Sequence, residues 1–423
     1  MDTREIAANI LAQLLNSGND YGFEAIAESQ ARAFAKRLVL TALRRLEYLK
    51  KVISGYSLKK LPQKLSKIHL LIILGAVEIL YFDTPEYAAV NSYVALAKKK
   101  DKYAGGFVNA VLRQICRNRQ QILGAAQQPF FPPSFYKLLA QDYSNDEIKA
   151  IAANAETVPP LDLTVKDKLS LWAEKLSARI RPDMGLRLFD SAVVSNLAGY
   201  DEGAWWVQDM ASSLAVKALG DIRKKSILDL CAAPGGKTAQ LINGGARVEA
   251  VDISRLRLDI LEENLKRLNL HAERIICQDA LLFLQDCKSY DIILLDAPCS
   301  ATGTLRRHPE IIHNRGENDV KACADLQKRL LSAAAQKVKP EGILLYAVCS
   351  LCKLEGEKQI ADFIKNNRDF AVLPVKLSDI APDNPKDMPS IITPEGFIRT
   401  LPSYYGGMDG FFIAQLKKVK NHE

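Results

Sequence analysis

The stretch "SILDLCAAPGGKT", from Ser226 to Thr238, indicates the fold of the C-terminal half of the chain. It opens with an apolar run that predicts a buried strand, and Pro234, Gly235 and Gly236 follow soon after. Glycines let the backbone approach a ligand closely, and the helix predicted after them presents free N–H groups. The pattern is neither G-x-G-x-x-G nor a P-loop, which disfavours a dinucleotide or ATP site.

The alternation of strand, loop and helix continues on the C-terminal side of this stretch. Further strands are predicted in "VEAVDIS", "RIICQDA", "DIILLDAPCS", "GILLYAVCS" and "FFIAQL". Most of these runs are continuously apolar, as strands are when helices cover both faces of a parallel sheet. The pattern predicts a Rossmann-like, doubly wound α/β domain over residues 205–420, with its ligands at the carboxyl ends of the strands.

Two other regions precede this domain. Residues 1–126 show helical spacing of apolar side chains and predict an all-helical domain. The Pro-rich "GAAQQPFFPPSFY" marks a boundary near residue 126, and residues 127–204 predict a linker with a small α/β module. The most apolar run, "LLIILGAV", is far shorter than the roughly 20 residues that cross a bilayer, so we expect a buried helix and no membrane partner.

Composition narrows the class of protein and of partner. The 423 residues carry a formal net charge of +8, which favours an anionic partner such as RNA, DNA or an acidic surface. The N-terminal residues show no secretory signal, so we expect the eight cysteines to be reduced thiols of a cytoplasmic protein. No interface signature stands out, and we expect a monomer.

Two aspartates follow the next predicted strands at positions that suit a nucleoside. Asp252 lies 17 residues after Gly235, where a carboxylate can accept hydrogen bonds from ribose hydroxyls. Asp279 follows the third strand, where it can reach an adenine amino group. A ribose and adenine site without a pyrophosphate clamp fits S-adenosylmethionine. The alternative is that these residues only form turns and cap helices, but the glycine turn and the two aspartates, three strand-end features in register, together favour the cofactor site.

Two cysteines also follow predicted strands, in "LLDAPCSATGT" and "LLYAVCSLC". Methylation at C5 of a pyrimidine would require a thiolate that adds at C6, a carboxylic acid at N3, and a group that helps to release the product. Asp296, Cys299 and Cys349 supply these residue types. Cys349 and Cys352 also form a C-x-x-C, but zinc would require a second pair at matching spacing. We therefore expect no metal, and the redox dithiol alternative lacks a thioredoxin-like context.

The motifs "VQDMASSLAV", "LDLCAAPGGKT", "DAPCSATGTLRRHPEI", "YAVCS" and "GMDGFFIAQL" resemble those of the NOP2/Sun class of RNA cytosine-C5 methyltransferases. "AAVNSYVALAKKKDKYAGGFVNAVLRQI" resembles the last helices of the NusB-like domain that bacterial small-subunit rRNA methyltransferases of this class carry at the N-terminus. The resemblance implies a NusB-like RNA-binding domain over residues 1–126 and a class I methyltransferase domain over residues 205–420. It also implies S-adenosylmethionine as cofactor, and 16S rRNA or an immature small ribosomal subunit as partner.

The resemblance further implies roles for individual residues. Cys349 would be the nucleophile at C6, Cys299 would assist product release, and Asp296 would contact N3 and the amino group of the cytosine. The implied S-adenosylmethionine site comprises Cys231, Ala232, Ala233, Pro234, Gly235, Gly236, Lys237, Asp252, Arg257, Asp279 and Asp296.

The chain departs from the family pattern near the nucleophile. Val348 stands where the family usually has Thr, and Cys352-Lys353 stands where an acidic residue and Pro are usual, whereas Glu355 matches. The stretch "LRRHPE" after Cys299 is a candidate RNA contact. Two other functions compete with methylation. A non-catalytic RNA-binding or assembly factor would need no intact thiols, and a nicotinamide oxidoreductase is disfavoured by the missing G-x-G-x-x-G.

Overall fold

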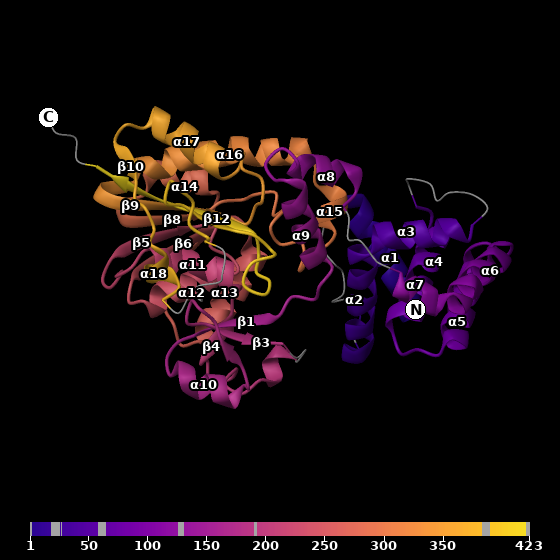
Figure 1. The fold of residues 1–423 in the computed structure, drawn as a ribbon. Coiled ribbons are helices and arrows are strands. Elements are labelled where there is room, and N and C mark those ends of the chain that lie inside the picture. The colour runs from indigo at the N-terminus through magenta and orange to yellow at the C-terminus, as the bar shows by residue number, and fades with distance from the viewer. Residues whose placement is uncertain are drawn as a thin grey trace. The chain divides into compact units, whose positions relative to one another are not determined.

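The computed structural model describes residues 2–17, 26, 28–57, 65–125, 131–189, 193–382 and 390–419. The chain divides into two compact units (Figure 1). The first comprises Met1–Thr157 and Leu305–Arg315, and the second comprises Val158–Thr304 and Gly316–Glu423. The domain boundaries predicted near residues 126 and 204 remain predictions.

The first unit is helical throughout its described part. Helices α1 to α7 contribute buried side chains to one apolar core. This agrees with the all-helical domain predicted for residues 1–126. The helices are α1 (Thr3–Ser17), α2 (Ser29–Arg44), α3 (Leu46–Gly55), α4 (Lys67–Tyr81), α5 (Glu86–Lys100), α6 (Ala104–Arg117), α7 (Arg119–Gly124), α8 (Pro133–Leu139), α9 (Asn145–Ala155) and α15 (Ile311–Asn314).

Helix α4 contains the most apolar run of the sequence and is buried from Leu70 to Leu80. The buried run includes Glu78, whose carboxylate is paired with the Arg4 guanidinium at 2.6 Å and accepts a hydrogen bond from the Tyr93 hydroxyl at 3.0 Å. A buried charge is tolerated when it is paired in this way. The prediction of a buried helix is confirmed, and no helix among the described residues has the length and apolarity needed to cross a membrane.

The second unit begins with a small four-stranded sheet in the order β2-β3-β1-β4. A buried ion pair supports it, because the Arg187 guanidinium donates to both carboxylate oxygens of Asp162 at 2.7 and 2.8 Å. This is the small α/β module that the sequence predicted. Its elements are β1 (Leu161–Val165), α10 (Leu169–Lys175), β2 (Arg179–Ile180), β3 (Leu186–Leu188), the 3-10 helix η2 (Val194–Asn196) and β4 (Trp205–Val207).

A larger, eight-stranded sheet follows, in the order β10-β12-β9-β8-β5-β6-β7, with β11 paired to β12. The five strands from β5 to β9 are parallel to one another, as predicted. The strands are β5 (Ser226–Leu230), β6 (Arg247–Asp252), β7 (Arg274–Cys277), β8 (Tyr290–Asp296), β9 (Val338–Val348), β10 (Phe370–Val372), β11 (Ile398–Thr400) and β12 (Phe411–Lys418).

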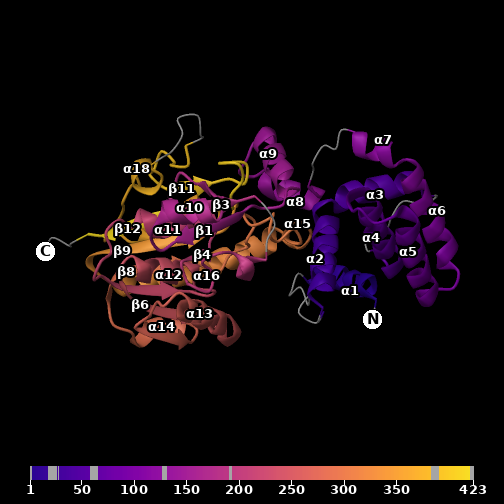
Figure 2. The same ribbon diagram turned by 90° about the horizontal axis from the view of Figure 1, so that it is seen from below.

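Helices cover both faces of this sheet (Figure 2). Apolar residues of α14, α16 and α17 pack on one face, and those of α11, α12, α13 and α18 pack on the other. This arrangement confirms the doubly wound α/β prediction. The helices are α11 (Met210–Ala218), α12 (Gly236–Asn243), α13 (Arg255–Arg267), α14 (Ala280–Asp286), α16 (Glu317–Gln336), α17 (Glu357–Asn366) and α18 (Leu377–Ile380).

The sheet differs from a wholly parallel one at its C-terminal edge. Strand β12, predicted from "FFIAQL", runs antiparallel to β9, with Phe412 opposite Val348. Strands β10 and β11 pair antiparallel with β12 in turn. An apolar run predicts a buried strand but carries no information on direction, because direction depends on how the preceding loop returns the chain to the sheet.

Candidate active site

The predicted site residues gather at the carboxyl ends of the parallel strands. Cys231 follows β5, Asp252 ends β6, Asp279 follows β7, Asp296 ends β8 and Cys349 follows β9. Because the five strands are parallel and adjacent, these ends share one rim of the sheet. The tertiary structure therefore brings together residues that are spread over about 120 positions of the sequence.

The two cysteines of interest face each other across the β8 and β9 ends. The Cys299 and Cys349 sulfurs are 3.3 Å apart, and both residues are half-buried. The hydrogen bond with Cys349, followed by burial, raises the pKa of Cys299 well above its ordinary value. The raised pKa keeps Cys299 protonated at neutral pH, so its S–H can donate to the Cys349 sulfur.

A carboxylate and an ammonium lie on the same rim. The Lys237 Nζ is 2.8 Å from Asp296 Oδ2, and the lysine is 8% exposed whereas the aspartate is 30% exposed. Lys237 comes from the first turn of α12, and its ammonium also lies 5.0 Å from the centre of the Phe411 ring. Asp296 is opposite Ala347 in the sheet, two residues before Cys349. The ion pair thus holds the Asp296 side chain near the thiol pair.

The glycine turn between β5 and α12 is closely packed. Gly235 has a φ of +99°, and a Cβ there would lie 2.7 Å from Leu261 Cγ, so a side chain would be strained in both respects. Asp252 is buried and accepts from the backbone N–H of Ala233 at 3.1 Å and of Ser254 at 2.9 Å. Each carboxylate oxygen keeps lone-pair capacity for a further donor such as a ribose hydroxyl.

Two other predicted cofactor residues have structural contacts of their own. The Arg257 guanidinium donates to the Ala233 carbonyl and lies 3.7 Å from Asp252 Oδ2. Asp279 Oδ1 accepts from the N–H groups of Leu281 and Leu282 at 2.8 and 3.1 Å, and so caps α14. Asp279 therefore caps a helix, as the alternative interpretation of the sequence proposed. Its contact with adenine remains a prediction.

Asp229 is a polar residue of this rim that the sequence analysis did not single out. It lies within β5 and is fully buried, and its Oδ2 accepts from the Thr238 hydroxyl at 2.6 Å. Its Oδ1 is buried without a hydrogen-bond partner among the described atoms. Burial raises the pKa of Asp229 to about 7. The signal was a charged residue inside the apolar run "SILDL".

Asp229 Oδ1, which has no hydrogen-bond partner among the described atoms, allows a test of whether the rim fits S-adenosylmethionine. A buried acceptor without a donor suits an ammonium group, which the methionine part of that molecule carries. Burial, with nearby carboxylates, raises the pKa of Cys231 to about 12, so this thiol stays neutral and can line an apolar part of the pocket. Together with the glycine turn and Asp252, these residues fit the predicted cofactor.

Below the thiol pair lies a second group that the sequence analysis did not assign. Glu355 is fully buried and accepts hydrogen bonds from Ser300 and Ser350, which directly follow the two cysteines. The sequence offered one signal for Glu355, namely its match to the family pattern, but that match did not indicate what the residue does.

The departures from the family pattern lie in packed surroundings. Val348 is fully buried in β9 and belongs to the apolar cluster that contains Tyr346 and Phe412. Valine fits this apolar environment in size and leaves no polar atom without a partner. Cys352 is also buried, with its sulfur 3.8 Å from the Thr302 hydroxyl, and lies among the polar residues beneath the rim.

The stretch after Cys299 differs from the expected RNA contact. Leu305–Arg315 belongs to the first unit, where the Arg306 side chain is 2% exposed and its carbonyl accepts from Arg44 Nη2 at 2.6 Å. The Arg306 side chain is therefore too buried to contact RNA in this structure, and the RNA contact of the rest of "LRRHPE" stays a prediction. His308 is exposed and remains a candidate.

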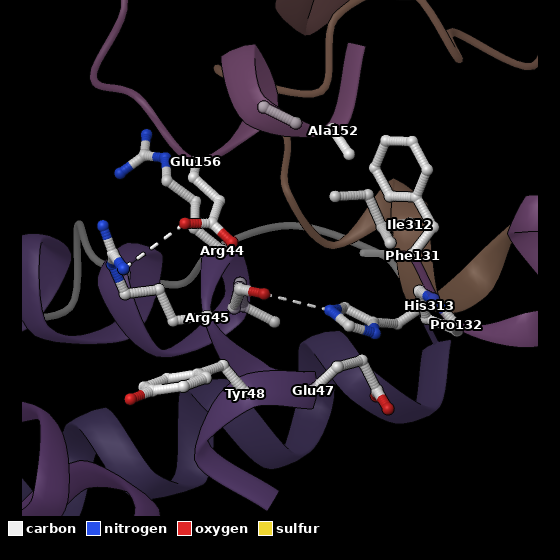
Figure 3. Close-up of a pocket in the computed structure, with 12 residues that line it drawn as sticks. Arg44, Arg45, Glu47, Tyr48, Phe131, Pro132, Ala152, Glu156, Ile312 and His313 are labelled. Atoms are coloured by element: carbon white, nitrogen blue, oxygen red, sulfur yellow. Dashed lines mark hydrogen bonds and ion pairs between the residues drawn. The ribbon is translucent and has the colours of Figure 1, made fainter. Parts of the chain in front are cut away.

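The same stretch lines a small pocket of the first unit (Figure 3). There His313 Nε2 donates to the Leu43 carbonyl at 3.0 Å, and Arg45 pairs with Glu156 at 3.3 Å. Burial lowers the pKa of His313, so the ring is neutral. These contacts hold the stretch in place. Among the described residues, no cluster of His, Cys, Asp and Glu could hold a metal ion.

Comparison with known proteins supports one family for the chain. The family model described as 16S rRNA methyltransferase RsmB/F matches residues 216–417, and the NusB family model matches residues 1–117. Ribosomal RNA small subunit methyltransferase B of Pasteurella multocida is 34% identical, over 99% of this chain and 96% of its own length. The protein of the same name from Klebsiella pneumoniae is 32% identical, over 100% and 99%.

Solved structures agree with the fold. The crystal structure of PH0851 has a TM-score of 0.73 at 22% identity and covers 99% of both chains. NSun6 from Pyrococcus horikoshii with SFG, an analogue of S-adenosylmethionine, has a TM-score of 0.58 at 22% identity, over 69% of this chain and 99% of its own. The chain therefore belongs to the RsmB family of S-adenosylmethionine-dependent 16S rRNA methyltransferases, with a NusB domain at its N-terminus.

Proposed function

We propose that the enzyme methylates C5 of a cytosine in 16S rRNA through a covalent adduct between Cys349 and C6 of the base. The observation that carries this proposal is the pair of sulfurs 3.3 Å apart beside the Lys237–Asp296 ion pair. C5 of a pyrimidine is a weak nucleophile, and addition of a thiolate at C6 makes it enamine-like. One thiol must attack, and a second group must assist when the product leaves.

The chain's own residues take the following parts. Cys349 as thiolate forms the bond to C6, while Asp296 accepts from the cytosine amino group and Lys237 offers a proton toward N3. S-adenosylmethionine, when bound, supplies the methyl group for C5. Once Cys349 is bonded to C6, Cys299 releases its own proton to solvent, and the resulting thiolate takes the C5 proton. The C5–H electron pair re-forms the C5–C6 double bond, the C6–sulfur pair returns to Cys349, and N3 returns its proton to Lys237.

The cofactor is proposed to lie along the β5, β6 and β7 ends. Asp229 would accept from its ammonium, the turn from Cys231 to Lys237 would lie against its methionine part, and Asp252 would accept from its ribose. Asp279 and Arg257 would lie at its adenine end. The substrate is proposed to be naked rRNA or an immature small subunit in the cytoplasm, bound by a monomer of the enzyme.

The test is transfer of labelled methyl to 16S rRNA and to immature subunits that lack the modification, followed by nucleoside analysis. We expect 5-methylcytidine from the wild type and none from Cys349→Ala, since the nucleophile is absent. Cys299→Ala should accumulate an enzyme–RNA adduct that survives denaturation, because release is impaired. Cys287→Ala, which replaces a cysteine at the end of α14, is the control and should retain activity. A methylated nucleoside other than 5-methylcytidine would contradict the proposal.

A further inference from the structure

The two thiols belong to separate turns, and one buried carboxylate connects these turns. Ser300 and Ser350 are the residues that directly follow Cys299 and Cys349. Glu355 Oε2 accepts from the Ser300 hydroxyl and from the Ser350 hydroxyl, each at 2.5 Å. We propose that Glu355 is a positioning residue, whose carboxylate joins the turn of the nucleophile to the turn of the second thiol and sets the separation of the sulfurs.

The other carboxylate oxygen strengthens the connection to the Cys299 turn. Glu355 Oε1 accepts from the Ser300 backbone N–H at 2.8 Å and from Gln327 Nε2 at 3.1 Å. Gln327 Nε2 also donates to the Pro298 carbonyl at 2.8 Å, so both neighbours of Cys299 are tied to the same group. We call Glu355, Ser300, Ser350 and Gln327 the Glu355 bridge.

The energetics of the bridge favour a role beyond packing. Glu355, Ser350 and Gln327 are fully buried, and Ser300 is nearly so. Within the described residues, no lysine or arginine forms an ion pair with this carboxylate, which is held by hydrogen bonds alone. Burying a carboxylate without a cation is costly even when it is fully hydrogen-bonded. An apolar contact would join the two turns with a smaller desolvation cost. Packing alone therefore does not explain why a carboxylate stands at this position.

The proposed reaction supplies that explanation. Both sulfurs must reach adjacent atoms of one base, and small errors in the position of a reacting group lower the rate steeply. Backbone contacts also join the turns, since the Gly303 N–H donates to the Cys349 carbonyl at 3.0 Å. The Glu355 bridge adds buried side-chain contacts between the same two turns. The hydrogen bond with Cys349 and burial raise the pKa of Cys299, and the charge of Glu355 raises it further. The Cys299 thiol therefore keeps its proton in the resting enzyme.

The catalytic part of this inference rests on the proposed function, whereas its geometric part does not. A cross-linking test separates the two. Diamide oxidises two nearby thiols to a disulfide; the thiols lose two electrons and two protons, and diamide becomes the hydrazine. The rate of Cys299–Cys349 disulfide formation, followed by peptide mass mapping in the full chain without RNA, reports how close and aligned the two sulfurs are.

Four variants are compared with the wild type. Glu355→Ala removes the bridge, and Ser350→Ala removes only its contact with the nucleophile's turn. Glu355→Gln keeps the shape, and its amide can donate to both hydroxyls. Asp291→Asn is the matched control, because Asp291 likewise accepts from a serine N–H and hydroxyl, those of Ser226, but at the opposite end of the sheet.

We expect cross-linking to slow at least about 10-fold in Glu355→Ala, to slow less in Ser350→Ala, and to stay near the wild-type rate in Glu355→Gln and Asp291→Asn. The kcat for methylation should fall by about 100-fold in Glu355→Ala. The KM for S-adenosylmethionine should change little, because none of the residues proposed to hold it belongs to the Glu355 bridge. Glu355→Gln should restore most of kcat while moving the pH profile to lower pH, since the thiol of Cys299 loses a nearby negative charge.

The outcomes distinguish failure of this inference from failure of the proposed function. Wild-type cross-linking rates in both Ser350→Ala and Glu355→Ala would overturn the positioning role, whatever the activity. If Glu355→Ala does not fold, Ser350→Ala alone decides the question by the same comparison. If cross-linking slows but Cys299→Ala forms no RNA adduct, the positioning of the sulfurs stands and the two-thiol reaction fails.

Discussion

Asp229 shows how a single buried residue links the fold to the cofactor. Burial raises its pKa to about 7, whereas in the unfolded chain an aspartate has its ordinary pKa near 4. Below about pH 4, Asp229 is protonated in both the folded and the unfolded state, so its raised pKa does not lower the free energy of unfolding there. As the pH rises toward 7 only the unfolded state ionises, so the free energy of unfolding decreases and stays low above pH 7.

We therefore predict that Asp229→Asn raises the free energy of unfolding of the ligand-free protein more at pH 8 than at pH 4.5. The difference between the two increases should be on the order of a few kcal/mol. Thermal unfolding of variant and wild type at both pH values measures this difference. S-adenosylmethionine should stabilise the wild type more than the variant. Asp291→Asn should differ from the wild type by nearly the same amount at both pH values. Hydrogen bonds from Lys339 and Ser226 outweigh burial and lower the pKa of Asp291 to about 2, so its contribution changes mainly below about pH 4. Equal pH profiles for Asp229→Asn and wild type would contradict the assignment.

At the scale of elements, the turn that follows β8 depends on a glycine. The Gly303 carbonyl accepts from the Gly410 N–H at 2.8 Å, and its own N–H donates to the Cys349 carbonyl. A Cβ at Gly303 would lie 1.8 Å from the Gly410 carbonyl oxygen, which is backbone and cannot move aside cheaply. The turn of the second thiol, the turn of the nucleophile and the start of β12 therefore meet at this position.

We predict that Gly303→Ala lowers kcat for methylation by at least about 100-fold. The clash with Gly410 displaces Gly303 and weakens its hydrogen bond to the Cys349 carbonyl, which joins the Cys299 and Cys349 turns. Methyl transfer and thermal unfolding, measured on the same sample, separate this local effect from loss of the fold. Gly106→Ala is the control, since a Cβ there meets open space on α6 and alanine favours a helix. Wild-type activity in Gly303→Ala would show that the turns tolerate the displacement.

At the scale of the whole molecule, the net charge of +8 and the rRNA substrate predict binding through phosphate contacts. The affinity for 16S rRNA fragments should fall as the salt concentration rises, because the release of counterions from the RNA then contributes less free energy to binding. For about five phosphate contacts, the decrease between 50 and 200 mM KCl would be about 100-fold. Equilibrium binding at several salt concentrations measures the slope. Binding of S-adenosylmethionine under the same conditions is the control, and a salt-independent RNA affinity would contradict the prediction.

Local patterns were sufficient for the order and type of the elements. Apolar runs predicted the strands from β5 to β9, and helical spacing predicted the helices of the NusB domain, because burial imposes a period that a short window of sequence already shows. The thiol motifs and the glycine turn were also readable, since parallel strands place their carboxyl ends on one rim. The proposed catalytic residues Asp296, Cys299 and Cys349 could thus be named before their distances were known.

Other features depended on contacts between distant parts of the chain. The antiparallel direction of β12, the inclusion of Leu305–Arg315 in the first unit and the burial of Arg306 have no local sequence signature. The roles inferred for Asp229 and Glu355 likewise follow from what surrounds them, because burial and hydrogen-bond partners change the pKa and geometry of a side chain without changing its sequence neighbours. Periodicity is a property of neighbouring residues, whereas direction, burial and pairing arise only when the packed chain excludes water.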